Sequence, residues 1–162
     1  MDCSRLLLAE DDEALASLLE EYLLEAGYHV DAYLRGDAAL VALQQKDYDL
    51  VLSDIVMPGA DGLSLLAYAQ AHTPDTLVIL MTGYSGIEDA LHAVEQGAYD
   101  FVSKPFQLPE IRVRLDNAGR YQQLLRRWRK TVGKVAAKSE MNRPDGLAVV
   151  RAYGRQTGGE WQ

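Results

Sequence analysis

Short apolar runs alternate with amphipathic helical segments along the first 120 residues, and this alternation predicts an α/β fold. The middle runs are almost continuously apolar, as in parallel strands that helices cover on both faces. A helical segment separates each run from the next, so the connections are strand–helix–strand crossovers, which are right-handed. We therefore expect a doubly wound, five-stranded parallel sheet.

Two strand–helix pairs begin the chain. The run RLLLA at 5–9 precedes an apolar stripe that recurs about every 3.6 residues and ends at Gly27. The segment YHVDAYL at 28–34 alternates polar and apolar residues, as an edge strand with one solvated face does. A short helix at 38–45 follows, and Asp37 is positioned to cap it.

Three further strand–helix pairs follow in the same way. Each strand is a short, mainly apolar run that a turn separates from the next helix. The expected strands lie at 50–53, 76–81 and 100–103, and the expected helices at 62–72, at 87–96 and from Leu108 onward. Five such pairs predict a flavodoxin-like sheet with the strand order 2-1-3-4-5 and helices on both faces, which binds ligands at the carboxyl ends of its strands.

Size and composition are those of an ordinary soluble globular protein. The 162 residues are 48% hydrophobic and 25% charged, which suits one domain with an appendage. No apolar run approaches the roughly 20 residues that a membrane-spanning helix needs, and we see no secretory signal. The single cysteine, Cys3, permits no internal disulfide and suits a reducing compartment. We expect a cytoplasmic protein.

Charge divides the chain into two parts. Residues 1–111 carry 20 acidic and 4 basic side chains, whereas residues 112–162 carry 4 acidic and 12 basic ones. The acidic part repels nucleic acid. The basic tail is therefore the only candidate for direct contact with nucleic acid, and we do not expect such contact to be the main function.

The basic part begins as a helix. A helical pattern continues through residue 138, with a broken apolar stripe that consists of Ile111, Leu115, Ala118, Leu125 and Val132. Residues 139–162 are rich in Gly, Asn, Pro and Arg, which predicts disorder. Three roles stay open for the helix at 121–138: a solvated extension, a helix that pairs with its copy, or an Arg-rich segment around Trp128 that contacts nucleic acid or an acidic partner.

Acidic residues follow two of the predicted strands directly. Glu10, Asp11 and Asp12 come after the first strand, and Asp54 comes after the third. If these strands are neighbours, their carboxylates share a small space and repel one another unless a cation intervenes. A hard divalent ion, Mg²⁺ or Mn²⁺ in its place, binds carboxylate oxygens and removes this repulsion. The sequence thus predicts a metal site at the carboxyl edge of the sheet.

A hydroxyl and an ammonium group complete the expected site. Thr82 follows the fourth strand, and SKPF at the end of the fifth presents Lys104, one of only four basic residues before position 112. A metal ion and a lysine would neutralise phosphoryl oxygens while the hydroxyl donates a hydrogen bond. This set fits phosphoryl transfer with Asp54 as the nucleophile that forms an acyl phosphate.

These motifs resemble the response-regulator receiver domains of two-component signalling. The resemblance covers roughly residues 4–120 and rests on LLLAEDDEAL, SDIVMPGADGL and MTGYSGIEDALHAVEQGAYDFVSKPF. The amino-acid sequence of these motifs is similar to that of receivers of the nitrogen-regulatory, sigma-54 activator type. However, no Gly-x-x-x-x-Gly-Lys loop or helix-turn-helix pattern follows them. The resemblance implies a receiver domain at 1–120, and the sequence pattern beyond it predicts a basic helical extension at 121–138 and a disordered tail at 139–162.

The resemblance implies the phosphorylation and metal roles. Asp54 would accept a phosphoryl group from a sensor histidine kinase in a reaction that depends on Mg²⁺. Asp11 would bind the ion directly and Glu10 through water, while Asp54 and the backbone carbonyl of Val56 complete the protein ligands. Asp12 is then a first-turn residue of the following helix, where negative charge suits the helix dipole.

The resemblance also implies residues that respond to the phosphoryl group. Thr82 and Lys104 would hold its oxygens, and Phe101 would turn inward as Thr82 moves. Gly83 leaves the site open, and Val56 and Tyr84 flank the phosphate. Gly83 and these flanking positions would tune how fast the aspartyl phosphate hydrolyses.

The implied function is a signalling switch that changes its partner-binding face. It needs no enzymatic activity beyond its own phosphoryl transfer and dephosphorylation. The output partner, or an effector fused to the domain, stays open. One alternative is a homodimer through 87–96, 100–103 and 108–130.

Two other classes of function share parts of this pattern. A phosphatase of the haloacid dehalogenase type also uses a strand-end Asp, a lysine and Mg²⁺, but it needs a second Asp two residues later, where this chain has Val56. A flavodoxin-like cofactor binder would set a flavin phosphate against the acids after the first strand, which would repel it. Single residues also have ordinary structural interpretations: Asp54 as a turn cap, Lys104 as a solvated loop residue and Phe101 as a core residue.

Overall fold

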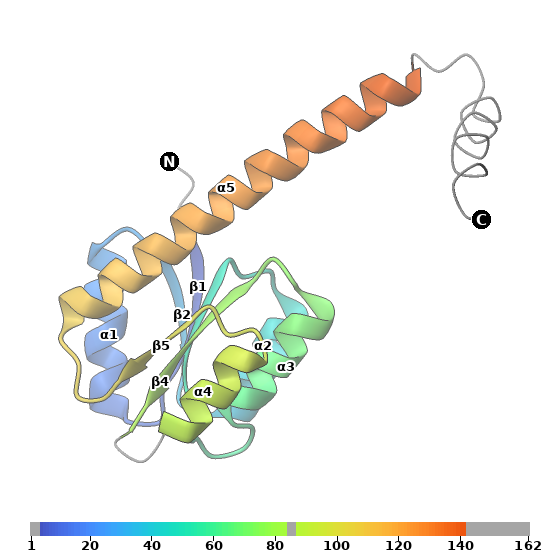
Figure 1. The fold of residues 1–162 in the computed structure, drawn as a ribbon. Helices are drawn as coiled ribbons and strands as arrows, with labels where there is room; N and C mark the ends of the chain where they lie inside the picture. The colour runs from blue at the N-terminus through green and yellow to red at the C-terminus, as the bar shows by residue number, and fades with distance from the viewer. Residues whose placement is uncertain (1–3, 84–86, 142–162) are drawn as a thin grey trace, which may run out of the picture. The chain divides into compact units, whose positions relative to one another are not determined.

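The computed structural model describes residues 4–83 and 87–141. Strands and helices alternate along this part of the chain (Figure 1). The strands are β1 (Arg5–Ala9), β2 (His29–Tyr33), β3 (Leu50–Asp54), β4 (Leu77–Thr82) and β5 (Asp100–Ser103). The helices are α1 (Glu13–Glu25), α2 (Gly36–Gln45), α3 (Gly62–His72), α4 (Ile87–Glu95) and α5 (Leu108–Met141).

The strands form one parallel sheet in the order β2-β1-β3-β4-β5. This order confirms the predicted doubly wound topology. The strand order reverses at β1, which has β2 on one side and β3 on the other, and such a reversal opens a crevice at the carboxyl ends of the strands. The register sets Ala9 beside Ser53 and Asp54 beside Met81, so the chain after β1 leaves the sheet where β3 ends.

Two hydrophobic clusters cover the two faces of the sheet. Alternate residues of a strand point to opposite faces, so Leu7 belongs to one cluster and Leu8 to the other. The Leu7 cluster includes residues of α2, α3 and α4, such as Leu65, and the Leu8 cluster includes Leu19 of α1 and Leu115 of α5. Helices accordingly flank the sheet on both sides (Figure 1). The nearly continuous apolar strands thus have no solvated face.

Two helix starts differ from the sequence-based expectation. Asp12 is the N-cap of α1 rather than a first-turn residue, because its side chain accepts a hydrogen bond from the Leu15 amide at 3.1 Å. Helix α2 begins at Gly36, with Arg35 at the N-cap position and no capping side chain. The prediction that Asp37 caps this helix was therefore wrong, and Asp37 lies in its first turn, where its charge favours the helix dipole.

The first compact unit of the chain ends at Gln123, slightly beyond the predicted domain limit at residue 120. The side chain of Gln122 explains the difference. It is only 3% exposed, and its Nε2 donates hydrogen bonds to the backbone carbonyls of Asp49 and Asp75, before β3 and β4 respectively. This part of α5 therefore belongs to the α/β unit.

The second compact unit is Leu124–Gln162, of which 124–141 is helical. Residues 142–162, most of the predicted tail, lie outside the described residues. Within the described residues, no helix is both long enough and apolar enough to cross a membrane.

Candidate functional site

The carboxyl edge of the sheet gathers the side chains that the sequence singles out. Glu10 follows β1, Asp54 ends β3, Thr82 ends β4 and Lys104 follows β5. All parallel strands end at the same edge, so groups as far apart in sequence as Glu10 and Lys104, which are 94 positions apart, meet there.

Lys104 connects two of the carboxylates. Its Nζ lies 2.8 Å from Glu10 Oε2 and 2.8 Å from Asp54 Oδ2. The side chains of Glu10 and Asp54 are 1% and 13% exposed, and that of Lys104 is 25% exposed. The Lys104 amide also donates a hydrogen bond of 2.6 Å to the carbonyl of Thr82, which holds the loop after β5 against the end of β4.

Burial and neighbouring charge oppose each other at these groups. Burial raises the pKa of Glu10, and the charge of Asp54 adds to this, although the hydrogen bond from Lys104 acts to lower it. Burial alone would lower the pKa of Lys104, but its hydrogen bonds to Asp54 and Glu10 outweigh this and raise its pKa. The single ammonium group of Lys104 faces two carboxylates, so it balances only part of their negative charge.

Asp11 completes a group of three carboxylates. Glu10, Asp11 and Asp54 each offer one oxygen, and these oxygens lie within 4.8 Å of one another. Asp12 has another task, because its carboxylate caps α1. Oxygen donors with surplus negative charge suit a hard divalent ion such as Mg²⁺. The residues present fit the predicted metal site.

Asp54 lines a cavity of about 240 Å³. Thr82, Lys104, Gly83 and Val56 line the same cavity. A methyl group built at Gly83 would meet no atom within 4 Å, so this side of the cavity has room for a ligand. The predicted nucleophile, hydroxyl and ammonium therefore share one accessible space.

Asp89 also lines this cavity, although the sequence did not single it out. It lies with Glu88 in the first turn of α4, where acidic residues are common because they favour the helix dipole. In the sequence, these two acidic residues therefore indicated only the start of a helix. Only the position of α4 in the fold brings Asp89 to the cavity.

The two predicted switch residues lie on adjacent strands. Thr82 is 2% exposed at the end of β4, and Phe101 of β5 is partly buried against the cluster that contains Leu80. The register pairs Phe101 with Leu80 and Ser103 with Thr82, so Phe101 lies two residues from the level of Thr82. Tyr84, the predicted tuning residue, lies outside the described residues.

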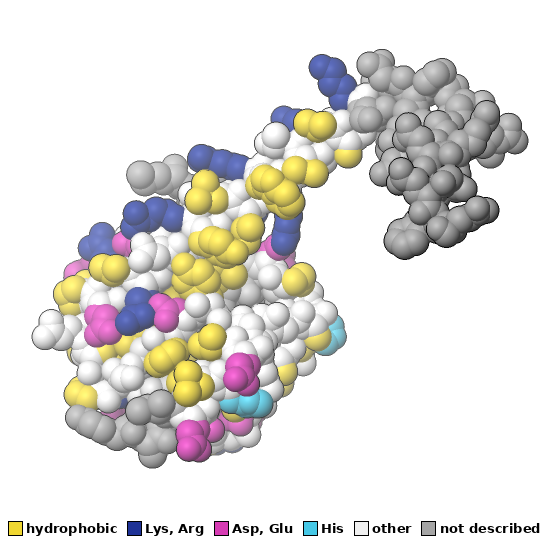
Figure 2. Space-filling view, viewed as in Figure 1, with side chains coloured by type: hydrophobic (Ala, Val, Ile, Leu, Met, Phe, Trp, Pro, Cys, Tyr) yellow, Lys and Arg dark blue, Asp and Glu magenta, His cyan; other side chains and the backbone are white. Residues whose placement is uncertain are grey.

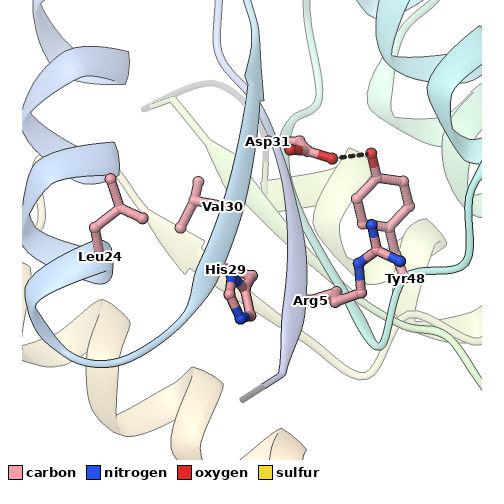
Figure 3. A pocket seen from close by; sticks show the side chains of 6 residues that line it. All are labelled: Arg5, Leu24, His29, Val30, Asp31 and Tyr48. Atoms are coloured by element: carbon pink, nitrogen blue, oxygen red, sulfur yellow. Dashed lines mark hydrogen bonds between the residues drawn. The ribbon is translucent and has the colours of Figure 1, made fainter.

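A larger cavity of about 530 Å³ lies elsewhere, near the amino ends of β1 and β2 (Figure 3). It is lined by Arg5, Leu24, His29, Val30, Asp31 and Tyr48. The Tyr48 hydroxyl donates a hydrogen bond of 2.5 Å to Asp31, whose carboxylate is the only one in this lining. The smaller acidic cavity, with its carboxylate cluster and lysine, is therefore the candidate functional site.

Residues 6–116, more than half of the chain, match the family described as the response regulator receiver domain. The chain belongs to this family. Receiver domains are the signalling domains of two-component systems, and the fold and the strand-end acids described above agree with this membership. The resemblance on which the sequence analysis relied is thereby confirmed.

Curated relatives of this receiver are response regulators, including the nitrogen-regulatory type. It is 40% identical over 118 residues to response regulator protein FleR of Pseudomonas aeruginosa, with 73% of this chain and 24% of the relative covered. It is 39% identical over 111 residues to the DNA-binding transcriptional regulator NtrC of Klebsiella pneumoniae, with 68% and 24% covered. For transcriptional regulatory protein RprY of Bacteroides fragilis the identity is 38% over 112 residues, with 69% and 48% covered. The chain thus spans half or less of the length of these relatives.

Solved structures give the same result. The receiver superimposes on NtrX from Brucella abortus with a TM-score of 0.74 and 28% identity, covering 80% of this chain and 29% of that one. A receiver domain protein from Clostridium thermocellum matches with a TM-score of 0.72, covering 75% and 98% of the two chains. At 23% identity, the second match supports the fold alone.

Proposed function

We propose that the chain is a phosphorylation-activated switch in which Asp54 accepts a phosphoryl group from a sensor histidine kinase. The observation that carries the proposal is the position of Lys104 Nζ, 2.8 Å from both Asp54 and Glu10, beside a group of three carboxylates. This arrangement offers a nucleophilic oxygen and an ammonium group to a phosphoryl group in the same cavity.

The transfer forms one bond and breaks another. A carboxylate oxygen of Asp54 attacks phosphorus, the P–N bond to the kinase histidine breaks, and the released imidazole takes a proton from solvent. Lys104 exchanges its contact with the Asp54 carboxylate for a phosphoryl oxygen, and the Thr82 hydroxyl donates a hydrogen bond to another. Hydrolysis of the aspartyl phosphate, at a rate that Gly83 and Tyr84 influence, returns the domain to its initial state.

The metal belongs to the same proposal. Glu10, Asp11, Asp54 and the backbone carbonyl of Val56 would hold Mg²⁺, or Mn²⁺ in its place. When bound, the ion supplies positive charge beside the phosphoryl oxygens. Asp11 would contact the ion directly and Glu10 would contact it through water.

The output is a change in the surface formed by α4, β5 and the first turns of α5. Thr82 moves toward the phosphoryl group, and Phe101 turns inward into the space that Thr82 leaves. Exposed apolar side chains support this choice of surface: Leu91 and Val94 of α4 are 56% and 45% exposed, and Val113 of α5 is 56% exposed. A second copy, a separate protein or a fused effector would bind there.

Mass spectrometry tests the phosphorylation. The full chain is incubated with Mg²⁺ and acetyl phosphate, which replaces the kinase as a donor, and we expect a gain of one phosphoryl mass. Asp54→Asn should abolish the gain, Lys104→Gln should strongly reduce it, and Asp61→Asn, a cap of α3 outside the cavity, should leave it intact. A gain that persists in Asp54→Asn, or that does not need a divalent ion, would contradict the proposal.

A further inference from the structure

The part of α5 in the second compact unit is an amphipathic helix that the proposed switch does not use. Leu124, Trp128, Val132 and Val135 are 63%, 63%, 45% and 65% exposed. At about 3.6 residues per turn, these four side chains and Leu125 fall within an arc of about 100° of the helix circumference. A stripe of this width normally packs against another surface, so its exposure indicates a binding face.

The remaining circumference of this helix is basic. Residues 117–139 contain seven Lys and Arg side chains and no Asp or Glu. Arg127, Lys130, Lys134 and Lys138 are all exposed. Figure 2 shows hydrophobic and basic side chains along this helix. One face is thus apolar and the other carries only positive charge.

We propose that residues 124–138 bind to the surface of a lipid bilayer that contains anionic lipids. The helix would lie along the bilayer, with the apolar stripe in the interface and the basic face against the head groups, as amphipathic helices rich in Lys and Arg do. Trp128 lies at the centre of the stripe, and tryptophan is enriched at membrane interfaces. This binding is peripheral and requires no spanning helix.

The stripe and the charge together favour this partner over two others. A nucleic acid would satisfy the basic face but would offer Leu124 and Val135 no apolar surface to bury. A second copy could cover the stripe in a coiled coil, but such pairing usually needs three to four heptads. The stripe from 124 to 135 is shorter than about two heptads. The acidic first unit is repelled by an anionic bilayer, but salt screens this repulsion beyond about 8 Å.

Vesicle binding tests the proposal with the full chain. Vesicles contain either phosphatidylcholine alone or an equal mixture of phosphatidylcholine and phosphatidylglycerol. In a Trp161→Phe background, Trp128 is the only tryptophan, since the chain has two. We expect the chain to co-sediment with the anionic vesicles only, with a blue shift of Trp128 emission, and to be released at about 0.5 M NaCl.

Matched variants separate the two faces of the helix. Lys130→Gln/Lys134→Gln should weaken binding about thirtyfold, whereas Arg35→Gln/Lys46→Gln, which removes the same charge from the first unit, should not change it. Trp128→Gln should also weaken binding about tenfold, because it removes the centre of the apolar stripe.

Four results would overturn the proposal. These are an absence of vesicle binding, equal binding to neutral vesicles, a vesicle-free dimer that Trp128→Gln dissociates, and binding of a DNA duplex as tight as that of the vesicles. The third would assign the stripe to a second copy, and the fourth would assign the basic face to nucleic acid.

Discussion

Asp11 and Asp12 are adjacent acids with different surroundings. Asp11 joins the carboxylate group with Glu10 and Asp54, where oxygens lie within 4.8 Å of one another. Asp12 instead accepts a hydrogen bond from the Leu15 amide and caps α1. The same substitution at these two positions should therefore have opposite effects on stability.

We expect Asp11→Ala to raise the free energy of unfolding by about 1 kcal/mol in the absence of divalent ions, because it removes repulsion among the carboxylates. Asp12→Ala should lower it by about 1 kcal/mol, because the N-cap is lost. Urea unfolding in EDTA measures both. Addition of Mg²⁺ should stabilise the unmodified chain and the Asp12→Ala variant, but it should stabilise the Asp11→Ala variant much less. Equal stabilisation of all three proteins would exclude Asp11 as a metal ligand.

Asp31 predicts a pH dependence of stability. Asp31 accepts a hydrogen bond from Tyr48 (Figure 3). This hydrogen bond and the charge of Lys46 lower the pKa of Asp31 below its ordinary value of 3.8. A carboxyl with a lower pKa in the folded state stabilises the fold above its unfolded pKa and loses this contribution as the pH falls through its folded value.

Asp31→Asn should therefore lower the unfolding free energy at pH 7, and the difference from the unmodified chain should shrink below about pH 3.8. Urea unfolding at pH 7 and pH 3 measures the difference. Tyr48→Phe, which removes the hydrogen-bond donor, should show the same trend. A destabilisation that stays constant over this range would mean that the carboxylate charge is not its cause.

At the scale of elements, Gln122 connects α5 to the chain before β3 and β4. Its Nε2 donates to the carbonyls of Asp49 and Asp75 and is buried. Gln122→Ala should lower the unfolding free energy by about 2 kcal/mol, because a buried polar contact is lost. The neighbouring Gln123 is exposed, so Gln123→Ala serves as the control and should change stability little. Equal effects in chemical denaturation would rule out this connection.

The elements themselves followed from sequence periodicity, but their ends did not. Nearly continuous apolar runs predicted the central strands, because burial on both faces requires apolar residues throughout a strand, and alternating polar and apolar residues predicted the edge strand β2. The caps of α1 and α2 were assigned incorrectly, because Asp12 and Asp37 each suit either a cap or a first turn. Backbone geometry at one residue decides between these positions, and composition does not record it.

At the scale of the whole molecule, the two compact units should separate by truncation. A chain that ends at Gln123 should keep the unfolding free energy and the acetyl phosphate reaction of the first unit. A chain that ends at residue 120, the limit predicted from sequence, should be less stable by about 2 kcal/mol, because it lacks Gln122. Denaturation and mass spectrometry compare the two chains, and equal stability would place the boundary at 120.

The sequence by itself determined the order of the elements, the family and the residue types of the candidate site. Glu10, Asp54, Thr82 and Lys104 each come at a strand end, and in a parallel sheet all these ends share one edge. This rule depends on chain connectivity alone. The rule therefore predicted that these four residues share one site, without any knowledge of the distances between them.

Only the tertiary structure decided how these groups meet. It set Lys104 Nζ at 2.8 Å from two carboxylates, brought Asp89 to the cavity and buried Gln122 while leaving Gln123 exposed. Such contacts join segments far apart in sequence, and they depend on strand register and on how each helix packs. Local sequence patterns report which face of an element is buried, but not what lies opposite that face.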